Sequence, residues 1–272
     1  MRRLDGLARM RRLDGKVPFR GGGFSPRESA WAAALTLIVV VALWQAAASA
    51  GLIPTLFLPA PVSIGRALWA LTISGELWRH LSASLFRLAV GWVTGTVFGI
   101  GMGLAVGLWS AFRSPGMAVV SALFPIPKIA LVPLFIIWFG IGEGAKIATV
   151  AFGVFFPTVI ATAGGVDGVP RGLIRMGQSF GLSRWAIVRK IVLPAALPAI
   201  LNAFRVTASI GIVLLVAAEM IGAEKGIGAF VLAAGNLYDT DNLLAGIVVL
   251  SILGLVVAWV IGRLERVFLR WR

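Results

Sequence analysis

Long apolar runs recur along this chain of 272 residues and are separated by short polar stretches. Six of these runs have the length of about 20 residues that a helix needs to cross a hydrocarbon core of roughly 30 Å. They cover about residues 30–50, 88–109, 117–139, 146–164, 197–218 and 243–262. The pattern therefore predicts an all-α integral membrane protein with six transmembrane helices.

The composition supports a membrane protein and changes how the net charge is interpreted. Hydrophobic residues make up 59% of the chain, charged residues only 13%, and the mean hydropathy is +0.95. An ordinary soluble chain contains about 25% charged residues, so a soluble domain could not bury this much apolar surface. The net charge of +14 would indicate nucleic acid in a soluble protein. Here we expect a lipid membrane and no nucleic acid.

The basic residues are concentrated in three segments. Eight Lys and Arg precede Trp31, five lie in 171–190, and four lie in 263–272. Because cytoplasmic loops of membrane proteins carry an excess of these residues, both termini and residues 168–198 are predicted to be cytoplasmic. We expect a multi-pass membrane protein. Four cations depart from the rule on the predicted outer side: Arg66, Arg79, Arg87 and Lys146.

The first apolar run has a strongly basic leader. We interpret residues 1–29 as a disordered basic cytoplasmic tail and residues 30–272 as the transmembrane domain. The basic leader, the apolar stretch and Ala48-Ser49-Ala50 together resemble a cleavable secretory signal. The run from Trp31 to Ala50 is longer than a usual signal core, so we favour a retained first span.

The second apolar run carries glycines at every fourth position: Gly95, Gly99, Gly103 and Gly107. Residues at this spacing share one face of a helix, and small residues allow helix backbones to approach closely in lipid. We favour packing within this chain over an interface between subunits.

The third run is interrupted by Pro125, Pro127 and Pro133, and Lys128 lies near its middle. A broken helix is tolerated in a membrane where it lines a cavity or packs on protein. Because an ammonium group at the midplane is costly, Lys128 is a candidate lining residue of a translocation path, with Pro127 and Pro133. The alternative left open is that Lys128 pairs with a carbonyl or reaches toward the headgroups. Glu219, which ends the fifth run, is similarly open between an outer gate and an ordinary interfacial residue.

The basic connector at 168–198 contains the signals of two short helices. Pro170 suits a first helical turn, and Gly181 suits the left-handed residue after a helix end. The helix between them carries Leu173, Met176, Gly177 and Phe180 on one face, largely away from Arg171, Arg175 and Gln178.

The second of these helices is predicted from Arg184 to Val192. Ser183 can cap its first turn, and Pro194 would end it. A connector resting on anionic lipid headgroups is the simpler explanation for basic, amphipathic helices. The Gly and Pro punctuation instead favours a shaped element that docks on a partner.

Sequence signals for catalysis are absent. The nearest approach to a Walker A motif, residues 10–17, lacks its first glycine and its Ser or Thr. The chain has no cysteine and a single histidine, His80, so neither thiolate chemistry nor a metal site is expected. We predict no catalytic residues, no metal and no cofactor, and any energy coupling must come from another chain.

The connector resembles the EAA loop of permease subunits in binding-protein-dependent ABC importers. That pattern is roughly Glu-Ala-Ala, three residues, Gly, about nine residues, and Ile-x-Leu-Pro. Gly181 matches the invariant glycine, and Ile191, Leu193 and Pro194 match the closing element. Residues 180–184 (FGLSR) resemble the usual core of the motif.

Other stretches resemble the nitrate, sulfonate and taurine branch of this family, over about residues 30–270. They are LPAP at 58–61, PKIALVPLFIIWFGIG at 127–142, FFPT at 155–158 and AAEM at 217–220. The resemblance implies a type I ABC importer permease bundle that works as a homodimer with cytoplasmic ABC ATPase subunits and an extracytoplasmic solute-binding protein. It also implies a small anionic solute of the sulfonate, taurine or nitrate type.

The resemblance further implies which residues couple the permease to the ATPase: Arg171, Arg175, Met176, Gly177, Phe180, Gly181, Ser183, Arg184, Leu193 and Pro194. One departure stands out, because Arg175 replaces the acidic residue at the head of the motif and Met176-Gly177 replaces the two alanines. The resemblance still implies the same helix placement, but the reversed charge removes the family's polar contact unless the partner carries a compensating acidic residue. Two other function classes remain: a stand-alone channel or facilitator, and, more weakly, an intramembrane enzyme.

Overall fold

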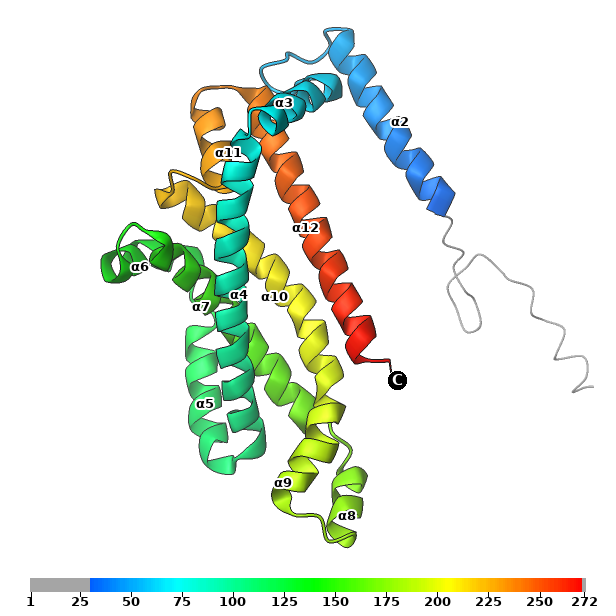
Figure 1. Ribbon diagram of the computed structural model, residues 1–272, viewed down its shortest axis with the longest axis vertical. Coiled ribbons are helices and arrows are strands. Elements are labelled where there is room, and N and C mark those ends of the chain that lie inside the picture. The colour runs from blue at the N-terminus through cyan, green and yellow to red at the C-terminus, as the bar shows by residue number, and fades with distance from the viewer. Residues whose placement is uncertain (1–29, 271–272) are drawn as a thin grey trace, which may run out of the picture. The chain divides into compact units, whose positions relative to one another are not determined.

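A computed structural model describes residues 30–270, so the predicted basic tail at 1–29 lies outside the described residues. The chain divides into two compact units, Met1–Ile53 and Pro54–Arg272. In the first unit the described element is α2 (Ala30–Ser49), an apolar helix whose side chains from Trp31 onward are mostly exposed. The second unit contains the remaining helices (Figure 1).

The second unit is helical throughout its described part. In chain order its elements are α3 (Pro61–Ile73), α4 (Glu76–Leu108), α5 (Ser110–Leu123), the 3-10 turn η1 (Lys128–Leu131), α6 (Val132–Phe139), α7 (Glu143–Asp167), α8 (Arg171–Ser179), α9 (Arg184–Ile187), the π-helical turn η2 (Val188–Val192), α10 (Leu193–Gly222), α11 (Ile227–Asn236) and α12 (Thr240–Phe268).

Five helices in the described residues are long and apolar enough to cross a membrane, and a bent pair would make a sixth span. The five are α2, α4, α7, α12 and the continuous helix from Arg184 to Gly222. The third predicted span is a broken pair, because α5 and the η1–α6 segment differ in direction by 88°. Prolines explain the break, since Pro125 and Pro127 remove backbone donors between the two helices.

The helix α4 begins at Glu76, well before the start expected from the apolar run at residue 88. The early turns contain buried polar side chains, Ser84 and Arg87, which the hydrophobic pattern assigned to a connecting segment. Polar residues can lie within a membrane helix where neighbouring helices supply their hydrogen-bond partners.

The core of the second unit is formed by α4, α7 and α10, which pack along one another (Figure 1). The glycine stripe of α4 faces α7: a Cβ added at Gly95 would lie 2.4 Å from the Ala151 carbonyl oxygen, and one at Gly103 would lie 2.5 Å from Thr162 Cβ. The glycines therefore allow the two backbones to meet, and packing within the chain is confirmed.

The expected helix end at Pro194 is wrong. The helix that starts at Arg184 continues through η2 into α10, with Pro194 in the first turn of α10 and Pro198 inside it. A π-helical turn widens the backbone just before Pro194. The widened turn can accommodate a residue that has no N–H and whose ring would clash with a regular preceding turn.

Candidate functional site

The 168–198 segment forms a folded platform at the end of the second unit opposite α3 and α11 (Figure 1). Its helix α8 lies close to η2, because a Cβ added at the buried Gly177 would be 2.7 Å from Ile191 Cδ1. Only a glycine at this position allows so short an approach without displacing Ile191.

Local signals shape the turn after α8 as the sequence predicted. Gly181 has φ +70°, in the left-handed region, where a residue with a Cβ is strained. The Ser183 hydroxyl accepts a hydrogen bond from the Ala186 N–H at 3.3 Å and caps α9. Both the left-handed glycine and the serine cap are confirmed.

An apolar cluster anchors this platform to the ends of the long helices. Its buried members are Val169, Ile187 and Val192. Partly buried neighbours pack against them from α4, α7, α8 and the following turns: Leu108, Val166, Ile174, Leu182, Ile191 and Ala195. The platform therefore cannot shift without displacing the ends of α4, α7 and α10.

The face predicted for α8 is split in the structure. Gly177 turns inward, whereas Phe180, Met176 and Leu173 are 78%, 50% and 40% exposed. Ile174 also faces inward and packs against the apolar cluster of Val169, Ile187 and Val192. The remaining predicted residues of this site lie in two places: Arg171, Arg175 and Arg184 are exposed on the platform, and Leu193 and Pro194 are half-buried in the first turn of α10.

A second candidate site lies at the break between α5 and α6. A pocket of about 280 Å³ is bounded on one side by residues 124–129 and on the other by Gly153, Ile210 and Leu214. The structure brings Pro127 and Lys128 to this pocket, whereas Pro133 lies in the first turn of α6 and is not among its lining residues.

The Lys128 ammonium group is held by its surroundings at this break. Lys128 Nζ donates a hydrogen bond to the Phe124 carbonyl oxygen. It also lies 4.7 Å from the centroid of the Phe124 ring and 5.5 Å from that of Phe156. Ring faces attract cations, so the charge is partly compensated while one side remains at the pocket. Pairing with a carbonyl, one of the readings left open by the sequence, is therefore present.

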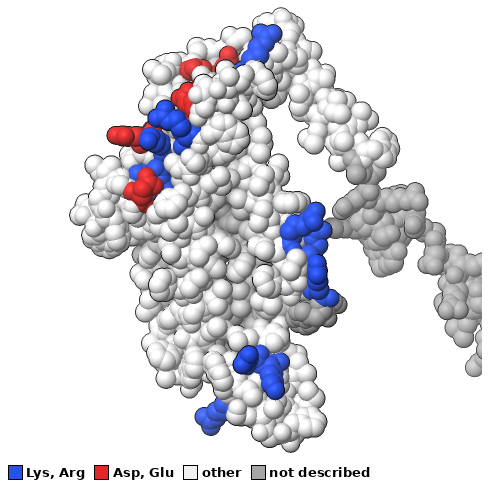
Figure 2. Space-filling view, viewed as in Figure 1, with Lys and Arg blue, Asp and Glu red and all other residues white. Residues whose placement is uncertain are grey.

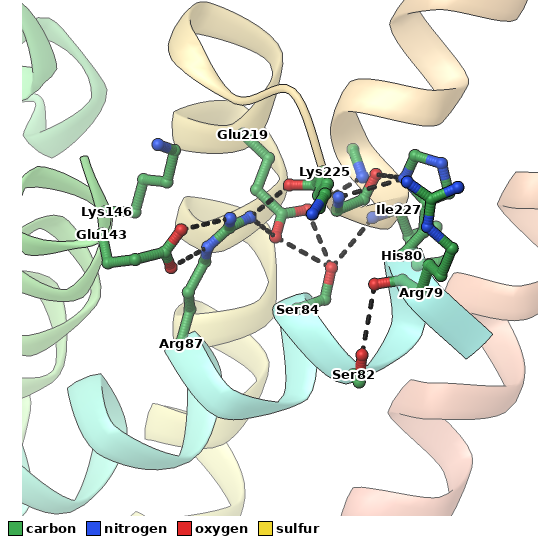
Figure 3. Close-up of polar contacts among 12 residues, drawn as sticks. Arg79, His80, Ser82, Ser84, Arg87, Glu143, Lys146, Glu219, Lys225 and Ile227 are labelled. Carbon is green, nitrogen blue, oxygen red and sulfur yellow. Dashed lines mark hydrogen bonds and ion pairs between the residues drawn. The ribbon is translucent and has the colours of Figure 1, made fainter. Parts of the chain in front are cut away.

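Glu219 belongs to an ionic group that we call the Arg87 cluster, formed by Ser84, Arg87, Glu143 and Glu219 (Figure 3). Arg87 and Glu219 are only 3% and 1% exposed. Glu219 is thus not an ordinary interfacial residue, because such a residue would reach water. A role at an outer gate remains a prediction.

Arg87 is the centre of the cluster. Its Nε and Nη2 donate to the two carboxylate oxygens of Glu143 at 2.5 and 2.6 Å. Its Nη1 donates to Glu219 Oε1 at 2.8 Å and to the Lys225 carbonyl oxygen at 2.6 Å. Arg87 on α4 therefore joins the start of α7, the end of α10 and the turn before α11.

The Glu219 carboxylate also accepts hydrogen bonds from neutral donors. Ser84 Oγ lies 2.8 and 3.0 Å from the two oxygens of Glu219, and the Gly228 N–H donates to Glu219 Oε2 at 2.9 Å. Ser84 Oγ in turn accepts from the Ile227 N–H at 2.9 Å. Bonds to charged groups in a site of low dielectric constant are strong, so the turn before α11 is firmly held.

Ser84, Arg87 and Glu143 were not predicted as members of one site. The available signal was the departure of Arg87 and Lys146 from the positive-inside pattern. Both are buried, and Lys146 Nζ donates to the Ile141 and Gly142 carbonyl oxygens at 2.8 and 3.1 Å. The positive-inside rule counts Lys and Arg in loops. Arg87 and Lys146 are buried and hydrogen-bonded, so they are not exceptions to it.

Comparison with known proteins gives consistent matches over most of the chain. The family model described as "Binding-protein-dependent transport system inner membrane component" matches residues 95–270. The taurine transport system permease protein TauC of Escherichia coli (strain K12) is 37% identical over 243 residues, which are 87% of this chain and 88% of that protein. The putative aliphatic sulfonates transport permease protein SsuC of the same strain is 38% identical over 232 residues, 85% of this chain and 88% of the relative.

A more distant relative and a solved structure agree with these matches. The SsuC protein of Bacillus subtilis (strain 168) is 34% identical and is covered over 85% of its length. An inward-facing structure of the MetNI methionine ABC transporter has a TM-score of 0.60 at 24% identity, covering 71% of this chain and 94% of that chain. At this identity the solved structure supports the helical fold of a type I importer permease alone.

Proposed function

This chain belongs to the family of inner membrane components of binding-protein-dependent transport systems, and we propose that it forms the translocation path of an ATP-driven importer for a small anionic solute. Family membership makes it a multi-pass membrane transport subunit of the ABC class and confirms the resemblance inferred from the sequence. The solute, the ATPase coupling and the assembly are our proposal.

The observation that carries the proposal is the 168–198 segment. It is a folded platform with exposed apolar and basic side chains, packed on the ends of three long helices. A connector that merely joined two spans would not require such a surface. We propose that it docks on a cytoplasmic ATPase, and that this end of the helices and both termini lie in the cytoplasm of a cell with an inner membrane.

The proposed assembly has two copies of this chain, two ATPase subunits and a solute-binding protein on the outer side. The platform continues into one helix of 39 residues, from Arg184 to Gly222, with a length of roughly 60 Å. Closure of the ATPases would move the platform, and this helix would carry the displacement to the pocket at Lys128 and to the Arg87 cluster.

The proposed solute is a sulfonate, taurine or nitrate type anion, in line with the names of the relatives. Lys128 provides the physical argument within this chain, since its ammonium group borders a pocket whose other walls are mainly apolar. In an anion with a short apolar tail, the charged group would pair with the ammonium group and the tail would contact the apolar walls.

The test is uptake of labelled taurine by proteoliposomes that contain this chain, its ATPase, its binding protein and ATP. Lys128→Ala should lower the uptake rate about tenfold or more, as expected for losing a bond to a charged group, and Lys128→Arg should retain most of it. Unchanged uptake by Lys128→Ala would refute the role of Lys128. Uptake by the purified chain alone, without ATPase, would favour a facilitator instead.

Docking is tested separately by copurification of the ATPase. Phe180→Ala should weaken it, because it removes the most exposed apolar side chain of the platform. Phe57→Ala is the matched control, since Phe57 is also 78% exposed but lies before α3. If both variants retain the ATPase equally, the platform is not the docking site.

A further inference from the structure

We propose that the platform recognises its partner by charge: the docking surface of the ATPase carries carboxylates around an apolar pocket that receives Phe180. This inference rests on the proposed function and specifies the chemistry of the partner. Arg175 would then pair with a carboxylate of the ATPase.

The first observation is a set of unpaired cations. Five basic residues of the platform are exposed, and none forms an ion pair with another residue in the range 30–270: Arg171, Arg175, Arg184, Arg189 and Lys190. The carboxylate nearest in sequence, Asp167, is occupied by Arg113, which donates to both of its oxygens at 2.8 and 2.7 Å. Figure 2 shows Lys and Arg but no Asp or Glu on the visible face of this end.

The second observation is an exposed apolar stripe on the same platform. Leu173, Met176 and Phe180 follow one side of α8 and its end, and all three are exposed. Aromatic and arginine side chains are enriched at protein interfaces, where burial of an aromatic ring excludes water from neighbouring charge pairs. The stripe and the cations thus require a partner with an apolar centre and an acidic border.

The third observation is that the surface is already formed. Gly177 allows α8 to contact η2 closely, and Ser183 and Gly181 fix the turn that presents Phe180. A surface that is ordered before binding loses little conformational entropy on docking. Recognition can then depend on the placement of a few charges.

Anionic lipid is the competing occupant, because basic amphipathic helices also bind membranes. The arrangement favours protein. The helix α8 has only nine residues, and the exposed cations of the platform continue beyond it onto α9 and η2. Figure 1 also shows α8 projecting beyond the ends of α4 and α5, away from the apolar length of those helices.

The experiment measures the affinity of the ATPase that copurifies with the native chain, for full-length variants in nanodiscs. Arg175→Glu should raise the Kd about tenfold or more, whereas Arg175→Lys should change it much less. Arg66→Glu is the control, because Arg66 is exposed on α3 and the substitution changes the net charge equally. Binding by the native chain should weaken as salt rises, and binding by Arg175→Glu should weaken less.

The outcomes separate this inference from the proposed function. If Phe180→Ala abolishes binding and Arg175→Glu does not, the platform docks without charge recognition and the inference is overturned. If neither variant changes binding, the proposed function fails as well. If the effect of Arg175→Glu occurs with phosphatidylglycerol and disappears in phosphatidylcholine alone, the cations serve lipid and the inference is overturned.

Discussion

Replacing Arg87 with methionine should destabilise the protein more than any other single removal of charge in the Arg87 cluster. The substitution keeps most of the side-chain length and removes all four donor contacts, two to Glu143, one to Glu219 and one to the Lys225 carbonyl. The Glu143 side chain is half-exposed and can turn to water. Glu219 is fully buried, so its charge is left with Ser84 and Gly228 alone.

The magnitude follows from this difference in burial. Removing one partner of a buried ion pair costs about 3–5 kcal/mol, because an uncompensated charge remains. For a chain of this size about 1 kcal/mol shifts the unfolding midpoint by 2–4 °C, so the midpoint should fall by roughly 6–20 °C. Glu143→Gln should cost less than Arg87→Met, because Glu143 is half-exposed and Arg87 keeps Glu219 as its counter-charge.

A double variant makes the reasoning refutable. Arg87→Met combined with Glu219→Gln removes the stranded charge but keeps an acceptor for Gly228, so it should be more stable than Arg87→Met alone. Tryptophan fluorescence during heating of the purified protein would report all midpoints, with Arg66→Met as an exposed control. A double variant no more stable than Arg87→Met would show that Arg87 does not serve to compensate Glu219.

Two further predictions concern the glycines. Gly103→Ala should cost about 1–3 kcal/mol by overpacking, because the added Cβ would lie 2.5 Å from Thr162 Cβ, whereas Gly101→Ala, with no atom within 4 Å, should not. The yield of folded protein in size-exclusion chromatography would compare them, and equal yields would contradict close packing of α4 on α7. Gly181→Ala should lower the free energy of unfolding by about 1–2 kcal/mol, because an alanine is strained in the left-handed conformation of this residue, and it should weaken ATPase binding. Gly181→Asn should have a smaller effect on both. An unfolding midpoint unchanged by Gly181→Ala would contradict the need for this conformation.

The sequence was sufficient where the determinants are local. The turn at Gly181 and the cap at Ser183 were both anticipated, because each depends on residues within a few positions of one another. The break in the third span was also anticipated from its prolines. The end expected at Pro194 failed because a π-helical turn, which no residue pattern marked, accommodates the proline.

The Arg87 cluster could not be predicted because its members are distant in sequence. Arg87 is 56 positions from Glu143 and 132 from Glu219. Hydrophobic periodicity says which residues avoid water, but it does not pair charges from three different helices. The periodicity therefore placed Arg87 outside the second span and left Glu219 as an isolated acid. In the structure both side chains are buried, and each compensates the charge of the other.

The helix from Arg184 to Gly222 connects all three sites. It starts in the platform, contributes Ile210 and Leu214 to the pocket at Lys128, and contributes Glu219 to the Arg87 cluster. Leu214 packs so closely on α7 that a Cβ at Gly153 would lie 1.9 Å from its Cδ1. A displacement of this helix along its axis must therefore move Leu214 against the pocket wall. Because Arg87 holds the far end, we expect such a displacement to change the pocket before it releases the cluster.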